Sequence, residues 1–218
     1  TARHQVADLI GAQPQEIVFT GCATEANNLA LLGVARALGT ARRHLVISAI
    51  EHPAVMAPAM LLREQGWDVT VVPVDGFGRI SLEALEKSLR TETALVSVMH
   101  ANNEVGTVQP IREIARLTRE RGIVLHTDAA QSAGKLPLHV DELGVDLLTL
   151  AGHKFFAPKG VGALYVRSGT PIRSVLHGAE QEHGLRPGTE NVASIVALGA
   201  AAGAAQRSLP TASEHMRE

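Results

Sequence analysis

Lys154 is the residue whose type and position point most directly to covalent chemistry. It stands in Gly152-His153-Lys154, directly after an apolar run at 147–150 that is typical of a buried strand. A lysine amine at such a strand end can form a Schiff base with a carbonyl compound. Lysine is exposed in most proteins, so a lysine that simply emerges to solvent at a loop is the simpler interpretation of this residue alone.

Asp128 is the second candidate, because it ends another apolar run and is followed by Ala129, Ala130 and Gln131. A carboxylate at the end of an apolar strand is costly unless it is paired. One suitable partner is the ring nitrogen of pyridoxal 5'-phosphate (PLP), which Asp128 would keep protonated so that the ring accepts electrons. Gln131 would then hydrogen-bond the phenolic oxygen. The stretch supports equally well an Asp128 that caps a helix beginning at Ala129 or Ala130.

A phosphate site and a proton carrier are the remaining candidates. The stretch 21–28 leads from a strand through small residues into a helix, with Ala23 and the hydroxyl of Thr24 near the first turn. Free backbone N–H groups at a helix start attract anions. The stretch lacks the lysine of a Walker loop. His52 begins another helix and could stack on an aromatic cofactor and move protons, although a partly exposed loop histidine is the commoner case.

The elements that must position these residues alternate between strands and helices along the whole chain. Several expected strands are apolar on both faces, which indicates a mostly parallel sheet covered by helices. The expected strands are Glu16–Thr20, His44–Ala49, Asp68–Val74, Thr93–Met99, Ile123–Thr127, Val145–Ala151 and Gly162–Val166. The expected helices are Thr24–Leu38, Pro53–Gln65, Ser81–Arg90, Ile111–Arg121 and Asn191–Arg207, with a further helical pattern at the first residues. The prediction is a three-layer αβα fold with a mostly parallel seven-stranded sheet.

The candidate residues all follow expected strands. In open α/β sheets, ligands bind at the carboxyl ends of the strands. Polar residues come after the first, second, fourth, fifth and sixth expected strands, and they include Thr24, His52, Asn103, Asp128 and Lys154. This coincidence predicts one shared site.

Composition narrows the class of protein. Of the 218 residues, 45% are hydrophobic and 19% charged, which is the balance of a globular domain. The net charge of −2 gives no reason to expect nucleic acid or an anionic membrane as a partner. No apolar run approaches the roughly 18 residues of a membrane span, and no histidines or cysteines show metal-ligand spacing. The single cysteine, Cys22, excludes an intrachain disulfide, which is consistent with a cytoplasmic protein.

Taken together, these stretches resemble the class V aminotransferase-like group of PLP enzymes, and within it the cysteine desulfurases and selenocysteine lyases. The matching stretches run in the family's order and cover nearly the whole chain. They are 19–28, 51–52, 99–106, 126–131, 152–164 and 182–191. The spacing of Asp128 and Lys154 also agrees with the family.

The resemblance implies a role for each matching residue. Lys154 would hold PLP as a Schiff base and His52 would stack on its ring, and these two are the implied catalytic residues. The implied cofactor-binding residues are Ala23, Thr24, His52, Asn103, Asp128, Gln131, His153, Lys154 and Thr189. Thr24 and His153 would bind the phosphate, and Thr189 would reach the phosphate of the neighbouring subunit of a homodimer. Asn103 would also lie near the substrate carboxylate, with Arg186 as a weaker substrate ligand. No metal is implied.

Two positions depart from the family. Ala151 stands where many relatives have a serine that contacts the phosphate, which removes a hydrogen bond worth about 0.5–1.5 kcal/mol. Cys22 lies in the phosphate loop and is not in register with the family's catalytic cysteine. We interpret Cys22 as a small filler, and a reactive thiol at a helix start is the alternative.

The implied activity is that of a PLP-dependent cysteine desulfurase, which converts L-cysteine to L-alanine and passes the sulfur to a catalytic cysteine as a persulfide. That cysteine would lie outside this chain, and a sulfur-acceptor protein is a further implied partner. Selenocysteine lyase, acting on L-selenocysteine, is the alternative enzyme, and a non-catalytic PLP-binding or dimerisation module is the alternative of another class. The expected organisation is a large PLP-binding domain at 1–207 and, at 208–218, the start of a connection to a small C-terminal domain. The chain is expected to be truncated at both ends.

Overall fold

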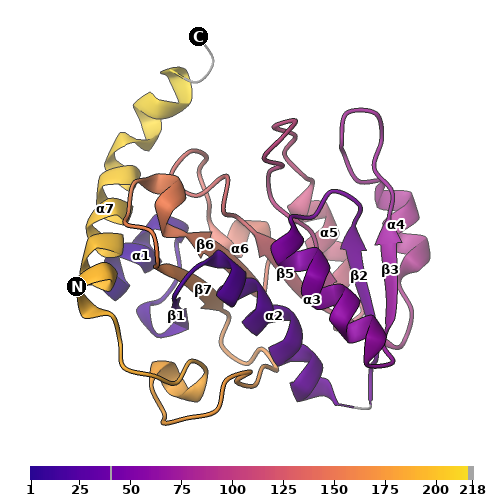
Figure 1. Cartoon of the computed structure of the whole chain (residues 1–218). Coiled ribbons are helices and arrows are strands. Elements are labelled where there is room, and N and C mark those ends of the chain that lie inside the picture. The colour runs from indigo at the N-terminus through magenta and orange to yellow at the C-terminus, as the bar shows by residue number, and fades with distance from the viewer. Residues whose placement is uncertain (40, 216–218) are drawn as a thin grey trace.

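A seven-stranded sheet forms the centre of the molecule (Figure 1). The structure is a computed structural model that describes residues 1–39 and 41–215. The strands are β1 (Ile17–Thr20), β2 (His44–Ser48), β3 (Asp68–Val72), β4 (Thr93–Ser97), β5 (Val124–Asp128), β6 (Leu147–Ala151) and β7 (Gly162–Val166). All seven expected strands are therefore confirmed, with ends that differ by no more than about two residues.

The direction of the strands brings their carboxyl ends to one edge. The sheet order is β1-β7-β6-β5-β4-β2-β3. Strand β7 runs antiparallel to its neighbours β1 and β6, and the other neighbouring pairs are parallel. Only β7 is thus reversed, and the expectation of a mostly parallel sheet is confirmed. Residues that follow the six remaining strands meet at the same edge of the sheet.

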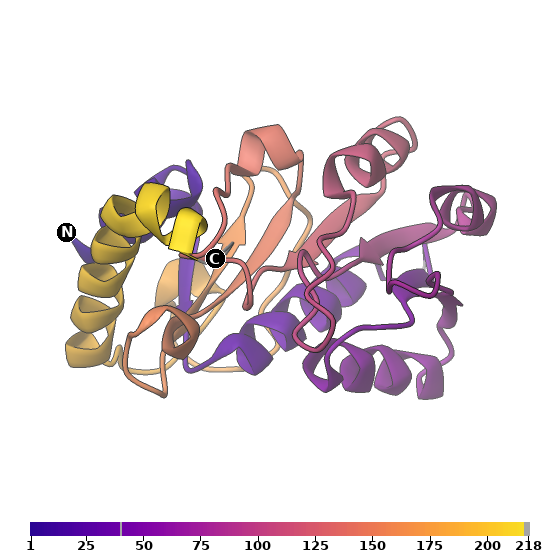
Figure 2. The same cartoon turned by 90° about the horizontal axis from the view of Figure 1, so that it is seen from above.

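Helices cover both faces of the sheet, which gives the three expected layers. Helices α2 (Ala23–Leu38) and α3 (Pro53–Glu64) pack on one face. The other face is covered by α1 (Ala2–Ile10), α4 (Leu82–Ser88), α5 (Ile111–Arg119), α6 (Val140–Leu143) and α7 (Val192–His215). Figure 2 shows the helices on either side of the sheet, with α1 and α7 packed side by side.

The sheet is buried on both faces because successive strand residues point to opposite layers. Leu125 on β5 belongs to the core under α5 and α7, whereas its neighbour Val124 belongs to the core under α2 and α3. All residues of β2, β4, β5 and β6 are buried. The apolar runs of the sequence are explained by this double burial.

Two helices differ from the expectation for local reasons. Ser81 is the N-cap of α4, and its Oγ accepts the Ala84 N–H at 3.2 Å. The helix ends at Ser88 rather than Arg90 because Leu89 is extended. Helix α6 was not expected, since it has only four residues and ends at Gly144, whose φ of 72° is left-handed. Short 3-10 helices also occur at Pro14–Glu16 (η1), Gly152–Phe155 (η2) and Glu182–Gly184 (η3).

Helix α7 is longer than expected. Its composition also contradicts the expectation that no apolar run approaches the length of a membrane span. It continues past residue 207 to His215, and its segment Val192–Thr211 is long and apolar enough, by length and composition, to cross a membrane. The run is easily overlooked in the sequence, because many small alanines supply much of its hydropathy. Leu198, Ala202 and Ala205 of this segment are buried in the core beside α1. Length and composition alone are weak evidence for a membrane span.

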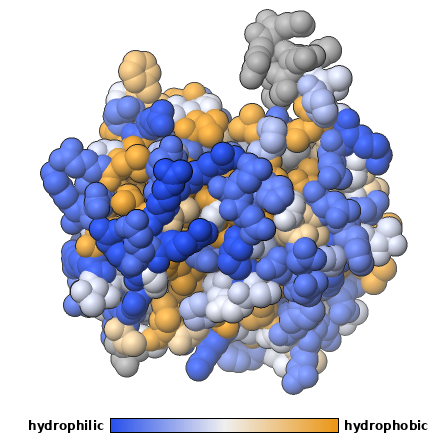
Figure 3. All heavy atoms as spheres, turned by 180° about the vertical axis from the view of Figure 1, so that it is seen from behind, coloured by the Kyte–Doolittle hydropathy of each residue, from blue (hydrophilic) through white to orange (hydrophobic). Residues whose placement is uncertain are grey.

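The outer surface of the helical layer is mostly hydrophilic. Figure 3 shows the molecule from behind, where hydrophilic residues dominate and hydrophobic residues form smaller patches. Helix α5 illustrates the cause, since it buries Ile111, Ile114 and Ala115 while Arg112 and Arg116 are exposed. The apolar face of such an amphipathic helix packs on the sheet, and its polar face contacts solvent. The helix therefore creates no large apolar surface.

Candidate active site

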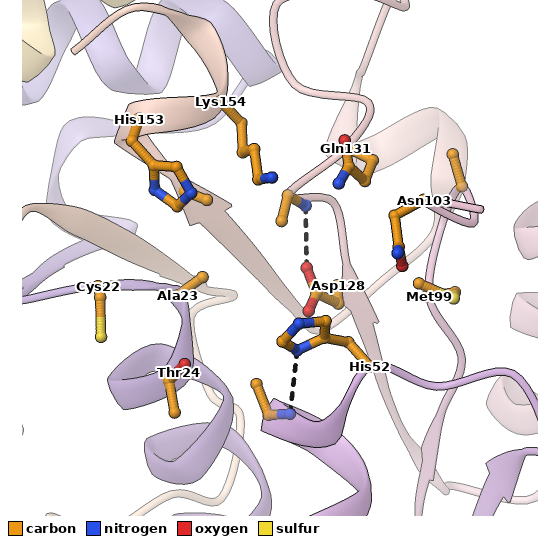
Figure 4. Close-up of a pocket in the computed structure, with 14 residues that line it drawn as sticks. Cys22, Ala23, Thr24, His52, Met99, Asn103, Asp128, Gln131, His153 and Lys154 are labelled. Carbon is orange, nitrogen blue, oxygen red and sulfur yellow. Dashed lines mark hydrogen bonds between the residues drawn. The ribbon is translucent and has the colours of Figure 1, made fainter. Parts of the chain in front are cut away.

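The polar residues that follow the strands surround a cavity of about 220 Å³ at the carboxyl edge of the sheet (Figure 4). It lies between the starts of α2 and α3, the loop after β4, the end of β5 and helix η2. The lining residues are Cys22, Ala23, Thr24, His52, Ala54, Met99, Ala101, Asn103, Asp128, Ala130, Gln131, Ala151, His153 and Lys154. Residues that follow five different strands therefore lie around one cavity, and its use as a shared functional site stays a prediction.

Asp128 is the buried acid of the cavity. Its Oδ2 accepts a hydrogen bond from Asn27 Nδ2 at 2.7 Å, and its Oδ1 accepts the Ala130 N–H at 2.9 Å. Burial raises the pKa of Asp128, while the hydrogen bonds from Ala130 and Asn27 and the nearby charge of His52 oppose that rise. Two donors are thus aimed at a carboxylate that the sheet holds away from water. The bond to Ala130 closes a turn and caps no helix, because residues 130–135 form a turn where the alternative interpretation expected a helix.

Lys154 enters the cavity from η2, directly after β6. The turn is tight, since a Cβ on Gly152 would lie 2.7 Å from the carbonyl oxygen of Val161. Phe156 ends η2 with a left-handed φ of 69°, which turns the chain away from the cavity. In Figure 4 the Lys154 amine points toward the Asp128 side of the cavity. No polar partner is recorded for this amine within the described part of the chain, so it is free to react with a ligand.

His52 approaches Asp128 from the opposite side of the cavity (Figure 4). It is the N-cap of α3, and its Nδ1 accepts the Ala54 N–H at 3.0 Å. An accepting Nδ1 leaves the proton of a neutral imidazole on Nε2. Proline at the first position of α3 supports the helix start, because its missing N–H needs no partner there. The ring is therefore fixed at one nitrogen and has the other available.

The start of α2 forms the remaining end of the cavity. Cys22, Ala23 and Thr24 line it, and Cys22 is exposed with no side-chain capping bond. The backbone of this loop lies close to β7, since a Cβ on Gly162 would be 2.9 Å from the carbonyl carbon of Cys22 and 3.1 Å from the Ala23 nitrogen. The free N–H groups at the helix start and the Thr24 hydroxyl together suit an anion.

Asn103, Gln131 and His153 complete the predicted set around the cavity. Gln131 Oε1 accepts a weak hydrogen bond from Lys135 Nζ at 3.3 Å, which leaves its amide nitrogen available. Burial and the nearby amines of Lys154 and Lys159 lower the pKa of His153. His153 therefore favours the neutral form, which can still donate one hydrogen bond to an anion.

Arg186 and Thr189 lie outside this cavity. Both line a separate cavity of about 150 Å³ beside β1 and η3. Arg186 Nε donates to Glu25 Oε1 at 2.7 Å, and Glu25 Oε2 accepts the Gly21 N–H at 2.8 Å. The predicted substrate role of Arg186 and the predicted reach of Thr189 into a neighbouring subunit stay predictions. The ion pair does tie the loop around Arg186 to the start of α2.

Two residues of the site were missed as contributors by the sequence reasoning. Asn27 was quoted only as part of the phosphate stretch, although its side chain is a partner of Asp128. Glu51 was noted only as the neighbour of His52, yet its carboxyl group is buried beside the cavity. A polar residue one helical turn inside an otherwise apolar helix was the available signal for Asn27. Within residues 1–39 and 41–215, no group of three or more histidine, cysteine, aspartate or glutamate side chains could hold a metal ion.

Comparisons with known proteins agree with this geometry. The family model described as aminotransferase class V matches residues 1–216. A cysteine desulfurase IscS of Dictyoglomus turgidum is 50% identical over 200 residues, which cover 92% of this chain and 51% of that protein. Among solved structures, a NifS-like protein gives a TM-score of 0.95 at 44% identity, over 99% of this chain and 60% of that one. A structure described as SspA in complex with cysteine gives 0.88 at 45% identity, over 92% and 58% of the two chains.

The chain spans about half the length of the curated relatives it matches. The residues that match the family model include every strand and every residue that lines the cavity. The match therefore applies both to the fold and to the cavity.

Proposed function

The chain belongs to the aminotransferase class-V family, and on that premise we propose that it forms the cofactor-binding part of a PLP-dependent cysteine desulfurase. The observation that carries the proposal is the convergence of Lys154, Asp128 and His52 on one cavity at the carboxyl edge of the sheet. An amine, a buried acid and an imidazole in that arrangement match the three groups that PLP chemistry requires.

The polar residues of the cavity suit each polar group of PLP, from the ring nitrogen to the phosphate. Asp128 would pair with the ring nitrogen, because its carboxylate already accepts two hydrogen bonds and faces the cavity. Lys154 would bond to the aldehyde carbon, and His52 would lie against the ring. Thr24, His153 and the backbone N–H of Ala23 would hold the phosphate. Asn103 and Gln131 would contact the phenolic oxygen.

The chemistry would then divide between the cofactor and the chain. When bound, PLP supplies an electron sink for the α-carbon of an amino acid. Asp128 would hold a proton on the ring nitrogen, and the desolvation around Asp128 would strengthen this pairing. Lys154 would supply the amine that binds the cofactor and would act as the base for the α-proton of the substrate. His52 carries protons through Nε2, since its Nδ1 is committed to the Ala54 N–H.

L-cysteine is the proposed substrate. The names of the relatives support it, as does a neighbour structure described as a complex with cysteine. In the balanced reaction, the carbon–sulfur bond of L-cysteine breaks, L-alanine leaves, and the sulfur joins a cysteine thiolate as a persulfide. That thiolate would come from outside this chain, because Cys22 belongs to the phosphate loop. Release of selenide from L-selenocysteine, and a purely structural PLP-binding module, are the alternatives.

Further properties of the whole protein belong to the same proposal. We infer a homodimer in which Thr189 reaches the phosphate of the neighbouring site, with Arg186 as an auxiliary substrate ligand. A separate sulfur-acceptor protein would receive the persulfide sulfur. A cytoplasmic location is consistent with the single cysteine, although a relative from Drosophila melanogaster is described as mitochondrial.

Titration with PLP tests the proposal directly. The purified chain is mixed with PLP, reduced with borohydride and digested, and the modified peptide is located by mass spectrometry. We expect a visible absorbance band that resists dialysis and a label on Lys154, both lost in Lys154→Ala. Lys159→Ala is the matched control, because Lys159 is exposed a few residues away and lies outside the cavity.

Three outcomes distinguish the desulfurase from its alternatives. A folded parent with no band, or a label spread over surface lysines, would refute the PLP site. A specific label combined with no release of alanine from L-cysteine, even in the full-length protein, would leave the structural module as the better description. Faster turnover of L-selenocysteine without persulfide formation would favour the lyase.

A further inference from the structure

Glu51 is a buried carboxyl group beside the cavity to which the proposed chemistry assigns no role. It lies three residues after the end of β2 at Ser48 and is 8% exposed. It is not among the residues that line the Lys154 cavity, but it lines a second cavity of about 310 Å³ together with His52 and Asn103. His52 and Asn103 line both cavities. Glu51 therefore lies on the far side of these two residues from the proposed cofactor site.

The hydrogen bonds of Glu51 join two segments of the site. Its Oε1 accepts the hydroxyl of Ser48 on β2 and, at 2.9 Å, the backbone N–H of Met99 in the loop after β4. A second bond between the same segments runs from Asn102 Nδ2 to the Ile50 carbonyl oxygen at 3.3 Å. These hydrogen bonds connect the loop after β2, which leads to His52, with the loop after β4, which contains Asn103.

The surroundings of Glu51 favour the protonated form. Burial, with a smaller contribution from the carboxylate of Asp128 on β5, raises its pKa to about 8 against the hydrogen bonds from Ser48 and Met99. The other oxygen, Oε2, has no hydrogen-bond partner within the described residues. The titratable groups around it are His52 on its own segment, Asp128 on β5 and Glu104 across the second cavity. A neutral carboxyl group avoids a second buried negative charge next to Asp128.

We propose that Glu51 is a positioning residue that holds His52 and Asn103 at their places around the cofactor cavity by fastening the end of β2 to the loop after β4. This inference rests on the proposed PLP site. A neutral Glu51 adds no second buried negative charge beside Asp128. Ionisation of Glu51 in alkaline solution would place that second negative charge behind His52 and next to Asp128.

Three variants test this role. Glu51→Gln keeps an oxygen that accepts from Ser48 and Met99 but cannot ionise. Glu51→Leu fills a similar volume and accepts no hydrogen bond. Glu104→Gln is the matched control, since Glu104 is exposed, lines the same second cavity and undergoes the same chemical change. For each, the dissociation constant for PLP is measured by visible absorbance from pH 6 to 9, and the unfolding free energy is measured without PLP from pH 5 to 8.

We expect Glu51→Leu to weaken PLP binding at least tenfold at pH 7, and Glu51→Gln to stay within about twofold of the parent there. Above pH 8 the affinity of the parent should fall while that of Glu51→Gln is retained, and Glu104→Gln should follow the parent. Without PLP, the parent should lose stability relative to Glu51→Gln between about pH 5 and 8. In this window the unfolded chain releases the Glu51 proton and the folded chain keeps it.

Identical pH profiles of the parent and Glu51→Gln would overturn the inference, and so would unimpaired binding by a folded Glu51→Leu. If Glu51→Leu does not fold, the comparison of the parent with Glu51→Gln decides alone. A parent that binds no PLP would refute the proposed function, and the unfolding measurements without PLP would then still decide whether Glu51 is a buried neutral group that fastens the two segments.

Discussion

Replacing Asn27 by alanine probes how the site holds the charge of Asp128. The Asn27 side chain is fully buried, and its Nδ2 donates to Asp128 Oδ2 at 2.7 Å. After the change, the carboxylate keeps only the bond from the Ala130 N–H at 2.9 Å. A buried oxygen then has no donor, so the ionised form of Asp128 becomes less favourable.

The expected loss of stability in Asn27→Ala depends on the charge of the Asp128 carboxylate, which accepts the hydrogen bond. A hydrogen bond to an ionised group contributes about 1.5–3 kcal/mol, and its buried acceptor keeps the desolvation penalty when the donor is removed. We therefore expect Asn27→Ala to lower the unfolding free energy of the PLP-free chain by about 2–3 kcal/mol at pH 7. Because a ring-nitrogen partner needs the ionised carboxylate, the dissociation constant for PLP should rise roughly tenfold.

Denaturant unfolding measured at several pH values provides the assay, and Asn28→Ala provides the control. Asn28 is the next residue of α2, and its Nδ2 donates only to the Thr24 carbonyl oxygen at the helix surface. Its replacement should change stability by less than about 0.5 kcal/mol. In acid, protonation of Asp128 removes the charge, so the difference between Asn27→Ala and the parent should shrink.

Equal effects of Asn27→Ala and Asn28→Ala would refute the reasoning, because burial and the charged partner would then contribute nothing. A large loss that is the same at every pH would also contradict it, since that result would assign the whole effect to the packing of the Asn27 side chain.

Three further changes test other parts of the structure by denaturant unfolding. Arg3→Ala leaves the buried carboxylate of Glu182 without its bidentate partner at 2.6 and 2.9 Å and should cost about 3 kcal/mol. Gly162→Ala places a Cβ 2.7 Å from the Leu150 carbonyl oxygen and against the start of α2, so it should destabilise by about 1–3 kcal/mol and weaken PLP binding. Burial lowers the pKa of His126 to about 3, so the parent should lose roughly 2 kcal/mol relative to His126→Asn between pH 6.5 and 4.5 as the unfolded chain takes up the proton.

Each of these changes has a matched control. Lys87→Ala breaks an exposed ion pair with Glu83 and should change stability by less than about 1 kcal/mol. Gly76→Ala adds a Cβ that meets no atom within 4 Å. His4→Asn replaces an exposed histidine and should leave the acid slope of the parent unchanged. A control as destabilising as its test variant would contradict the corresponding explanation.

The sequence predicted the layers and most of the site because both depend on local patterns. Runs that are apolar on both faces identify buried strands, and the strand-end rule then places Asp128 and Lys154 together without any knowledge of the loops between them. The reversed direction of β7 did not follow from the pattern, since a short apolar run has no direction of its own. It depends on the tight η2 turn that joins β6 to β7.

The contacts that the sequence did not predict join residues far apart in the chain. Asn27 and Asp128 are 101 positions apart, and Arg186 and Glu25 are 161 positions apart. No periodicity or spacing links such pairs, so the sequence could not predict that Arg186 pairs with Glu25. Helix α7 extends to His215, eight residues beyond the expected end at Arg207.

The pairing of β1 with β7 has a consequence for synthesis of the chain. β1 is complete at residue 20, but its partner is complete only at residue 166. At a translation rate of roughly 5–20 residues per second, β1 waits roughly 7–30 s for that partner. Helix α1 waits longer still, because it packs against α7. During synthesis, the apolar residues of α1 and β1 therefore stay without these partners until β7 and α7 have been made.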